Sequence, residues 1–368
     1  MIRVLVVDDS GFMRLAIKKM LAHDPMISVV GEATNGRDAL RLAQMHRPDV
    51  ITMDVEMPDG DGLTATKQIM ETCPTAIIMV SSLTKGAAET TLKALELGAV
   101  DYIPKASSFV SLDIVAIEKD LISKIRYWSK KRPIVTMRQL SRSSDPVKVK
   151  TTAQSPDIHR LRPVSDPDII VIGASTGGPK VLPELLACVN PLRCPMIIAL
   201  HMPPVYTKSF AEHVAAATGH NTTEGFDGMA LKPGMVVVCP GGTDSEVHAS
   251  IDNRYVLRVR LQSQYGIHPS VDALFYSAAQ NCRSSVGVIL TGMGDDGTAG
   301  ALQMSLRRFP ILCQDEASSL VYGMPRAAAE AGAASAVLSV ADIAQKLNMW
   351  AGAPLRTPRT RRENSNDR

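Results

Sequence analysis

The sequence predicts two doubly wound α/β domains joined by a linker, and three observations lead to this fold class. The chain has 368 residues, enough for two domains of ordinary size. Apolar residues make up 45% and charged residues 21% of the chain, as in globular rather than disordered proteins. In both halves, short β-branched runs alternate with longer amphipathic segments, which is typical of parallel sheets covered by helices.

The first domain is predicted to span residues 1–126. Between its β-branched runs lie segments with helical periodicity, such as 11–22 and 85–97. The runs predicted as strands are 4–7, 28–33, 50–53, 76–80 and 100–103. Five βα units of this kind build a parallel sheet with helices on both faces.

A linker and a second α/β domain are predicted to follow. Residues 127–166 are rich in Ser, Thr, Pro, Lys and Arg and lack apolar periodicity, which predicts a flexible linker. The second domain is expected over 167–352, and the Arg-rich tail over 353–368 is expected to be disordered. In the second domain we expect strands at 169–172, 196–200, 235–239, 286–291 and 310–313, and helices at 179–189, 208–217, 271–281, 298–306 and 340–350.

The net charge of +3 is concentrated outside the two predicted domains. The segment 124–163 has eleven Lys and Arg against two acidic residues, and the tail 356–368 has five Arg against two acidic residues. The rest of the chain therefore carries −9, the difference between +3 and +12. This distribution argues against a broad cationic face for nucleic acid on the folded domains.

The spacing of the cysteines and the hydropathy of the chain indicate where in the cell the protein is expected. The six cysteines are scattered without a C-x-x-C pair, which predicts reduced thiols rather than a disulfide framework. No apolar stretch reaches the roughly 18 residues that a membrane-spanning helix needs. We therefore expect a cytoplasmic protein without membrane insertion.

Acidic and polar residues follow four strands of the first predicted sheet. Asp8 and Asp9 follow the first strand, Asp54 the third, Ser81 the fourth and Lys105 the fifth. The carboxyl ends of parallel strands meet at one edge of the sheet. Three carboxylates there repel one another unless a cation lies between them, and oxygen ligands suit Mg²⁺. A single such aspartate is usually only a helix N-cap, but the whole ordered set predicts a phosphoryl acceptor site.

With these residues in place, residues 1–126 resemble the receiver domains of two-component signalling systems, which have a flavodoxin-like fold. The resemblance implies that Asp54 is phosphorylated by a histidine kinase, and segment 53–58 carries the D-x-x-M-P pattern. Lys105 is followed by Ala106, where receivers commonly have proline. The resemblance also implies Mg²⁺ ligation by Asp8, Asp9, Asp54 and the backbone carbonyl of Glu56, phosphoryl contacts from Ser81 and Lys105, and a switch aromatic at Tyr102.

A glycine-rich segment follows the first strand of the second domain. Residues 173–179 read G-A-S-T-G-G-P and satisfy the G-x-S-x-G pattern of a nucleophile elbow, with Ser175 as the nucleophile. Small residues permit the sharp strand-to-helix turn, and helix N-terminal amides favour a developing oxyanion. A glycine-rich turn of this kind could equally cradle a phosphate.

Two later strand ends supply partners that favour a nucleophile. His201 ends the next predicted strand, and residues 291–297 read T-G-M-G-D-D-G directly after another. A carboxylate from this loop would hold the imidazole and complete a Ser-His-Asp triad. The adjacent Asp295 and Asp296 would repel a phosphate. The order Ser, His, Asp differs from the Ser, Asp, His order of α/β-hydrolases.

The second half of the chain resembles the catalytic domain of the CheB family, the chemotaxis protein-glutamate methylesterases. Thr243-Asp244 is a departure, because relatives often have a histidine there. Alignment on T-G-M-G-x-D-G places the catalytic carboxylate on Asp296, and the resemblance nominates Thr176 and Met293 as oxyanion-side contacts. The matching blocks are G-A-S-T-G-G at 173–178, H-M-P-P at 201–204, C-P-G-G at 239–242, P-S-V-D at 269–272, T-G-M-G-D-D-G at 291–297 and Y-G-M-P at 322–325.

The CheB resemblance implies a phosphorylation-activated serine hydrolase. Its substrates would be glutamate γ-methyl esters and specific glutamines on methyl-accepting chemotaxis receptors, and the esterase reaction would need no cofactor. We expect a monomer. Two alternatives remain at this point: a transcriptional response regulator with a DNA-binding effector, and a nucleotide-binding oxidoreductase, although no G-x-G-x-x-G follows the first strand of either domain.

Overall fold

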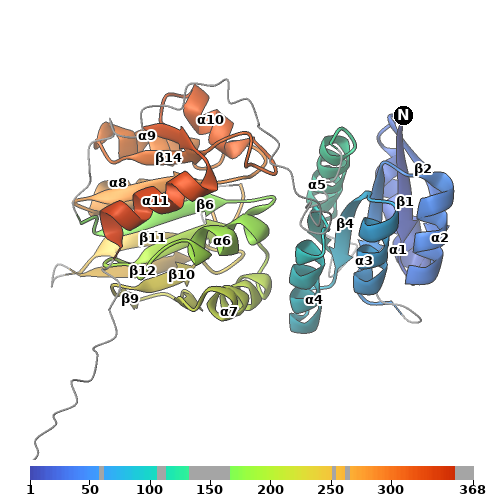
Figure 1. Cartoon of the computed structure of the whole chain (residues 1–368), viewed down its shortest axis with the longest axis horizontal. Coiled ribbons are helices and arrows are strands. Elements are labelled where there is room, and N and C mark those ends of the chain that lie inside the picture. Colours follow the sequence, from blue (N-terminus) through green and yellow to red (C-terminus); the bar gives the residue numbers. More distant parts are fainter. Residues whose placement is uncertain (58–61, 106–112, 132–165, 251–253, 262–265, 353–368) are drawn as a thin grey trace, which may run out of the picture.

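The computed structural model describes residues 1–57, 62–105, 113–131, 166–250, 254–261 and 266–352. Figure 1 shows two α/β domains, with helices α4 (Lys85–Glu96) and α5 (Asp113–Trp128) of the N-terminal domain on the side that faces the C-terminal domain. No helix among the described residues is both long and apolar enough to cross a membrane. Residues 132–165 of the predicted linker 127–166 and the predicted tail 353–368 lie outside the described residues.

The N-terminal domain is a five-stranded parallel sheet with the strand order β2-β1-β3-β4-β5. This order confirms the predicted flavodoxin-like fold. Its third and fourth strands are mostly apolar and buried along their whole length, because helices cover both faces of the sheet. Before α4 the elements are β1 (Ile2–Val7), α1 (Gly11–Ala22), β2 (Ile27–Ala33), α2 (Gly36–His46), β3 (Val50–Asp54), α3 (Gly62–Thr72) and β4 (Ala76–Ser81), and β5 (Asp101–Pro104) lies between α4 and α5.

Helix α5 extends two residues past the predicted domain end at 126. Trp128 is 2% exposed and packs in the same apolar cluster as Ile125 and Leu121. Burial of the Trp128 side chain stabilises the last turn of the helix, so the helix continues through this residue. The boundary predicted from composition is therefore placed too early, because the basic residues around Trp128 masked the last turn of the helix.

The C-terminal domain has a seven-stranded parallel sheet with the strand order β15-β14-β13-β6-β7-β10-β8. Helices cover both faces, as the prediction of a doubly wound domain requires. The elements are β6 (Ile169–Ala174), α6 (Gly178–Ala187), β7 (Met196–Leu200), α7 (Tyr206–Thr218), β8 (Asn221–Glu224), β9 (Met229–Leu231), β10 (Met235–Val238), β11 (Asp244–Ala249), β12 (Tyr255–Arg260), α8 (Val271–Asn281), β13 (Ser285–Ile289), α9 (Thr298–Leu306), β14 (Ile311–Gln314), α10 (Met324–Glu330), β15 (Ala336–Leu338) and α11 (Val340–Ala351).

A three-stranded antiparallel sheet, β11-β12-β9, lies beside the main sheet and was not expected from the sequence. Strand β11 reads D-S-E-V-H-A, and four of its six residues are polar or charged. Helix α8 packs directly on this strand. The small sheet therefore supports the N-terminal end of α8, which matters for the site described below.

The two domains are in contact along α4 and α7, and α4 also packs on α6. At the centre, the ring of Tyr102 stacks on that of Tyr206, with centroids 5.2 Å apart and an interplanar angle of 8°. The Tyr206 hydroxyl donates to the carbonyl of Ser82 over 3.2 Å. At the other end of the interface, the Tyr127 hydroxyl donates to the carbonyl of Leu320 over 2.9 Å. The C-terminal domain thus meets the N-terminal domain at Tyr102, the predicted switch residue.

Candidate functional site

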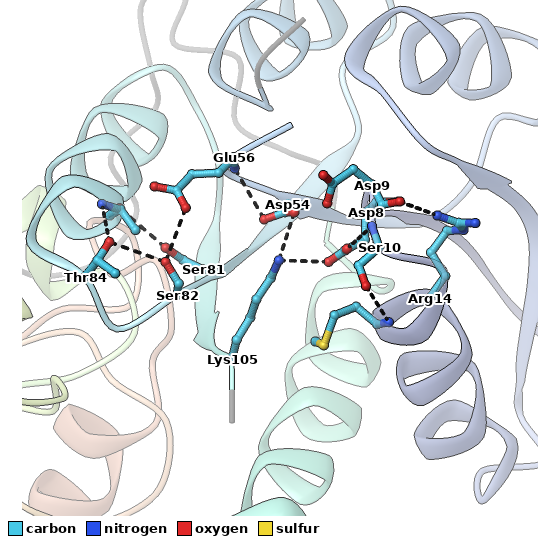
Figure 2. A network of polar contacts seen from close by, with 12 residues as sticks. Asp8, Asp9, Ser10, Arg14, Asp54, Glu56, Ser81, Ser82, Thr84 and Lys105 are labelled. Carbon is cyan, nitrogen blue, oxygen red and sulfur yellow. Dashed lines mark hydrogen bonds and ion pairs between the residues drawn. The ribbon is translucent and has the colours of Figure 1, made fainter. Parts of the chain in front are cut away.

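The carboxyl edge of the N-terminal sheet brings together the predicted acidic residues and lysine (Figure 2). Lys105 Nζ lies 3.0 Å from Asp8 Oδ2 and 2.8 Å from Asp54 Oδ2. Asp8 is fully buried, Asp54 is 2% exposed, and Asp9 is exposed. One carboxylate oxygen from each of these three aspartates lies within 4.8 Å of the others. This all-oxygen donor set has the chemistry and spacing that a hard divalent cation requires.

The electrostatics of this cluster favour a proton or a cation on Asp54. Burial raises the pKa of Asp54 to about 6, the hydrogen bond from Lys105 opposes this rise, and the charge of Asp8 adds to it. Burial lowers the pKa of Lys105, but Asp54 and Asp8 more than reverse this effect, and the net pKa is raised. The lysine therefore stays charged and partly balances two acids that would otherwise repel each other.

The other residues predicted for the phosphoryl site are Glu56, Ser81 and Tyr102. The backbone N–H of Glu56 donates to Asp54 Oδ1 over 3.3 Å. Ser81 is fully buried at the end of β4, where it accepts a hydrogen bond from Thr91 over 2.8 Å. Tyr102 is buried against Tyr206. Ser81 and Tyr102 thus lie on the α4 side of the N-terminal domain, which borders the C-terminal domain. Pro58 of the D-x-x-M-P pattern lies outside the described residues.

Ser175 occupies the turn between β6 and α6, as the elbow pattern predicts. Gly177 has φ of +83°, and a Cβ there would lie 2.7 Å from the Cβ of Leu320, so only glycine fits this tight turn. The N–H of Ser175 donates to the carbonyl of Thr291 over 3.0 Å. Strand pairing aligns Ala174 with Leu200. Ser175 and His201 are the next residues on each strand, so they emerge side by side.

His201 and Asp296 form the carboxylate-imidazole pair predicted from the sequence. Nε2 of His201 lies 2.7 Å from Asp296 Oδ2. This contact uses Nε2 for the carboxylate and leaves Nδ1 as the ring nitrogen available to Ser175. Asp295, its neighbour in the loop, is exposed. The assignment of the carboxylate to Asp296 rather than Asp295 therefore agrees with the geometry.

The N-terminus of α8 holds the Asp296 carboxylate. The backbone N–H groups of Val271 and Asp272 donate to it over 2.8 and 3.0 Å, and the Ser270 hydroxyl donates over 3.2 Å. Burial raises the pKa of Asp296, but the hydrogen bond and charge of His201 and the two helix N–H groups outweigh it, and the net pKa is lowered. Asp296 is thus kept ionised and fixed in direction.

Ser175 and His201 open onto a cavity of about 430 Å³ that lies between the two domains. The N-terminal domain contributes Tyr102, Asp120 and Lys124 to its lining. The N-terminal domain therefore forms part of the wall of this cavity.

The two predicted oxyanion-side residues flank Ser175. Thr176 is buried, lines the cavity, and accepts the Thr291 hydroxyl on its carbonyl over 2.9 Å. Met293 is half-buried in the loop where a Cβ on Gly292 would lie 2.9 Å from the Cβ of Ser175. Both residues are therefore near the nucleophile, and their contribution to catalysis remains a prediction.

Sequence reasoning missed two features of this site. The first is the role of Ser270, Val271 and Asp272: the P-S-V-D block was visible, but only the fold shows that this helix start faces Asp296. The second is Tyr206, which is fully buried between the domains. The sequence predicted this helix to begin at residue 208, and no pattern marked Tyr206 as a contact between the domains.

Comparison with known proteins identifies both halves of the chain. The Response regulator receiver domain family matches residues 4–115, and the CheB methylesterase family matches residues 170–347. The second match disfavours both the DNA-binding effector and the oxidoreductase, because it assigns the same residues to a methylesterase domain.

Curated relatives match along nearly the whole chain. "Protein-glutamate methylesterase/protein-glutamine glutaminase 1" of Oleidesulfovibrio alaskensis is 41% identical, over 94% of this chain and 98% of that protein. "Protein-glutamate methylesterase/protein-glutamine glutaminase 2" of Nitratidesulfovibrio vulgaris is 40% identical, with the same coverage. The crystal structure of the Thermotoga maritima CheB methylesterase catalytic domain is 32% identical, and the match covers 50% of this chain and 97% of that one at a TM-score of 0.48. The chain therefore belongs to the CheB family of protein-glutamate methylesterases/protein-glutamine glutaminases, in which a receiver domain precedes a methylesterase domain.

Proposed function

We propose that this chain is a phosphorylation-activated serine hydrolase that demethylates glutamate γ-methyl esters on methyl-accepting chemotaxis receptors, with Ser175, His201 and Asp296 as its catalytic triad. The observation that carries this proposal is the 2.7 Å contact between His201 Nε2 and Asp296 Oδ2. It lies at the cavity into which Ser175 opens. Membership of the family supports the proposed reaction, and this geometry supports the assignment of the three catalytic residues.

The reaction follows from the roles of the three side chains. His201 takes the proton of the Ser175 hydroxyl, whose oxygen attacks the ester carbonyl, and Asp296 stabilises the imidazolium. His201 then returns the proton to the leaving methoxide, so that methanol departs and a glutamyl ester of Ser175 remains. Water activated by His201 hydrolyses this intermediate to the free carboxylate. With glutamine as the substrate the same steps release ammonia, which accounts for the glutaminase activity in the relatives' names.

The developing oxyanion needs donors near Ser175. We assign this role to the segments that carry Thr176 and Met293, because both adjoin the nucleophile and the Ser175 N–H is already donated to Thr291. A donor of this kind is worth on the order of 10²-fold or more in rate. The esterase reaction is proposed to need no cofactor.

Asp54 is proposed to accept a phosphoryl group from a chemotaxis histidine kinase. Mg²⁺ would be held by the carboxylates of Asp8, Asp9 and Asp54 and the carbonyl of Glu56, where it would neutralise the charge of the transferred group. Lys105 is already within 3.0 Å of both buried acids, and Ser81 ends the neighbouring strand. These two side chains are proposed as phosphoryl contacts.

Control of the esterase is proposed to act through the domain interface. A phosphoryl group adds about −1.5 to −2 charges at pH 7. Ser81, Ser82 and Tyr102 connect the phosphoryl site to Tyr206, so a rearrangement around Asp54 reaches this contact directly. Phosphorylation would then shift the equilibrium from the covered to the open cavity. We further propose that the protein works as a cytoplasmic monomer that binds neither nucleic acid nor the membrane.

Methanol release from methylated receptor tests the proposal. The full chain should release methanol faster with Mg²⁺ and a small phosphodonor than without them. Ser175→Ala should abolish release under both conditions, and Asp54→Asn should retain the basal rate but lose the stimulation. Unchanged turnover in Ser175→Ala would refute the catalytic assignment.

A further inference from the structure

A second carboxylate-imidazole pair lies at the same cavity as the triad. His268 lines the cavity with Ser175 and His201. Its Nδ1 lies 3.0 Å from Oδ1 of Asp244, the first residue of β11. Asp244 is 1% exposed, and the His268 side chain is 32% exposed. A buried acid therefore anchors a histidine whose ring reaches the cavity wall.

The Asp244 carboxylate fixes the whole segment before α8. Its Oδ1 also accepts the backbone N–H of Ser270 over 2.7 Å. Among the described residues, Oδ2 of Asp244 has no hydrogen-bond partner. Both donors to this carboxylate therefore come from residues 268–270. Because a buried charge is costly unless paired, this arrangement holds His268 firmly in place.

The direction of the His268 ring follows from this contact. When Nδ1 donates to a carboxylate, Nε2 is left for a ligand, and in the imidazolium form of the ring Nε2 carries an N–H that can donate to an anionic group. Within the described part of the chain, no hydrogen bond to His268 Nε2 is found. The triad does not use this ring, since His201 and Asp296 already satisfy each other.

The charges of the residues that line the cavity indicate which kind of group His268 binds. The esterase residues that line the cavity include Lys180 and the two histidines, and no aspartate or glutamate of the esterase domain is among the described lining residues. The carboxylates among the described lining residues are Asp101 and Asp120 of the receiver, which would leave with it. Once the receiver leaves, Lys180 is the one fixed charge among the described lining residues, and it is complementary to an anionic group on the substrate polypeptide.

We propose that His268, positioned by Asp244, is a specificity-determining residue that binds a carboxylate side chain of the substrate polypeptide near the glutamyl ester. This inference rests on the proposed function, because it supposes that a polypeptide ester enters the cavity. The expected contact is a charge-assisted hydrogen bond, for which loss of the carboxylate reduces kcat/KM about tenfold. Since the contact exists before and during the reaction, the loss should appear mainly in KM.

Two synthetic peptides test this contact. Each carries one glutamyl methyl ester, flanked by glutamates in one peptide and by glutamines in the other. The full chain with Mg²⁺ and a phosphodonor should prefer the glutamate-flanked peptide by about tenfold in kcat/KM. His268→Gln should reduce this preference to about threefold or less with kcat nearly unchanged, and Asp244→Asn should act in the same direction.

His248→Gln is the matched control. His248 also pairs with a carboxylate, Glu246 at 2.8 Å, and its side chain is 37% exposed, but it does not line the cavity. It should keep the wild-type preference. His268→Gln keeps the test decisive if Asp244→Asn does not fold, because His268 is partly exposed. Equal turnover of both peptides by the wild type, or an undiminished preference in His268→Gln, would overturn the inference. Failure of the wild type on both peptides would instead contradict the proposed function.

Discussion

Asp54 and Asp296 are both sheltered aspartates at or just beyond the carboxyl ends of parallel strands, yet their pKa values are shifted in opposite directions. Burial dominates at Asp54, where the nearby charge of Asp8 adds to it, and the pKa rises to about 6. At Asp296 burial acts in the same sense, but His201 and the N–H groups of α8 outweigh it and lower the pKa.

The difference lies in the donors that surround each carboxylate. Asp54 shares one lysine with Asp8, so the excess negative charge of this pair favours a bound cation. Asp296 accepts hydrogen bonds from an imidazole, a hydroxyl and two helix N–H groups. It therefore stays ionised and orients a catalytic base. One residue type performs two kinds of chemistry because the fold supplies different neighbours.

The largest effect is expected when the Asp296 charge is removed. Asp296→Asn should lower kcat for methanol release on the order of 10³-fold or more, since the imidazole loses both its orientation and its counter-charge. The measurement is methanol release from methylated receptor at saturating phosphodonor.

Asp295→Asn is the matched control for this variant, because Asp295 is the adjacent, exposed acid. Its kcat should stay within about twofold of the wild type. Similar losses of kcat in the two variants would show that kcat depends on the conformation of the loop and not on the contact between Asp296 and His201.

An intermediate effect is expected on the stability of the receiver. Because the folded-state pKa of Asp54, about 6, lies above the unfolded value of about 3.9, its contribution to stability is present below about pH 4 and is lost as the pH rises through about 6. At pH 7.5 the ionised carboxylate costs on the order of 2 kcal/mol. Asp54→Asn should therefore raise the receiver's Tm at about pH 7.5 without Mg²⁺ and have much less effect near pH 4.5.

Calorimetric scans of the full chain at both pH values provide the measurement. A variant that is less stable than the wild type at the higher pH would mean that the ion pair with Lys105 outweighs the cost of burying Asp54.

The smallest effect is expected at the domain interface. Tyr206→Phe removes the hydrogen bond to the Ser82 carbonyl but keeps the ring that stacks on Tyr102. A net loss of about 1 kcal/mol corresponds to about a fivefold shift toward the open form. Methanol release without phosphodonor should rise by up to this factor, while the rate at saturating phosphodonor should stay nearly constant. An equal change in both rates would indicate an effect on catalysis instead.

Much of both sites could be predicted because they follow strand ends. Asp8, Asp54 and Lys105 lie at the carboxyl ends of β1, β3 and β5 of one parallel sheet, so recognising the strands already places them at the same edge. Ser175 and His201 likewise follow neighbouring strands. The apolar runs that form these strands are buried on both faces and are therefore easy to recognise.

The rest depends on contacts between residues far apart in the sequence. Strands β8 and β11 are short and rich in polar residues, so hydrophobic periodicity could not indicate them. The donors to Asp296 come from 24 to 26 residues upstream, at the start of α8. Tyr206 is buried by another domain, and no local pattern encodes that contact.

The central claim is that phosphorylation of Asp54 uncovers Ser175. The most direct measurement is the rate at which a serine-reactive fluorophosphonate probe labels Ser175 in the full chain, with and without Mg²⁺ and a phosphodonor. The account predicts faster labelling with the phosphodonor, no acceleration in Asp54→Asn, and no labelling in Ser175→Ala. A labelling rate that is the same with and without the phosphodonor would contradict it.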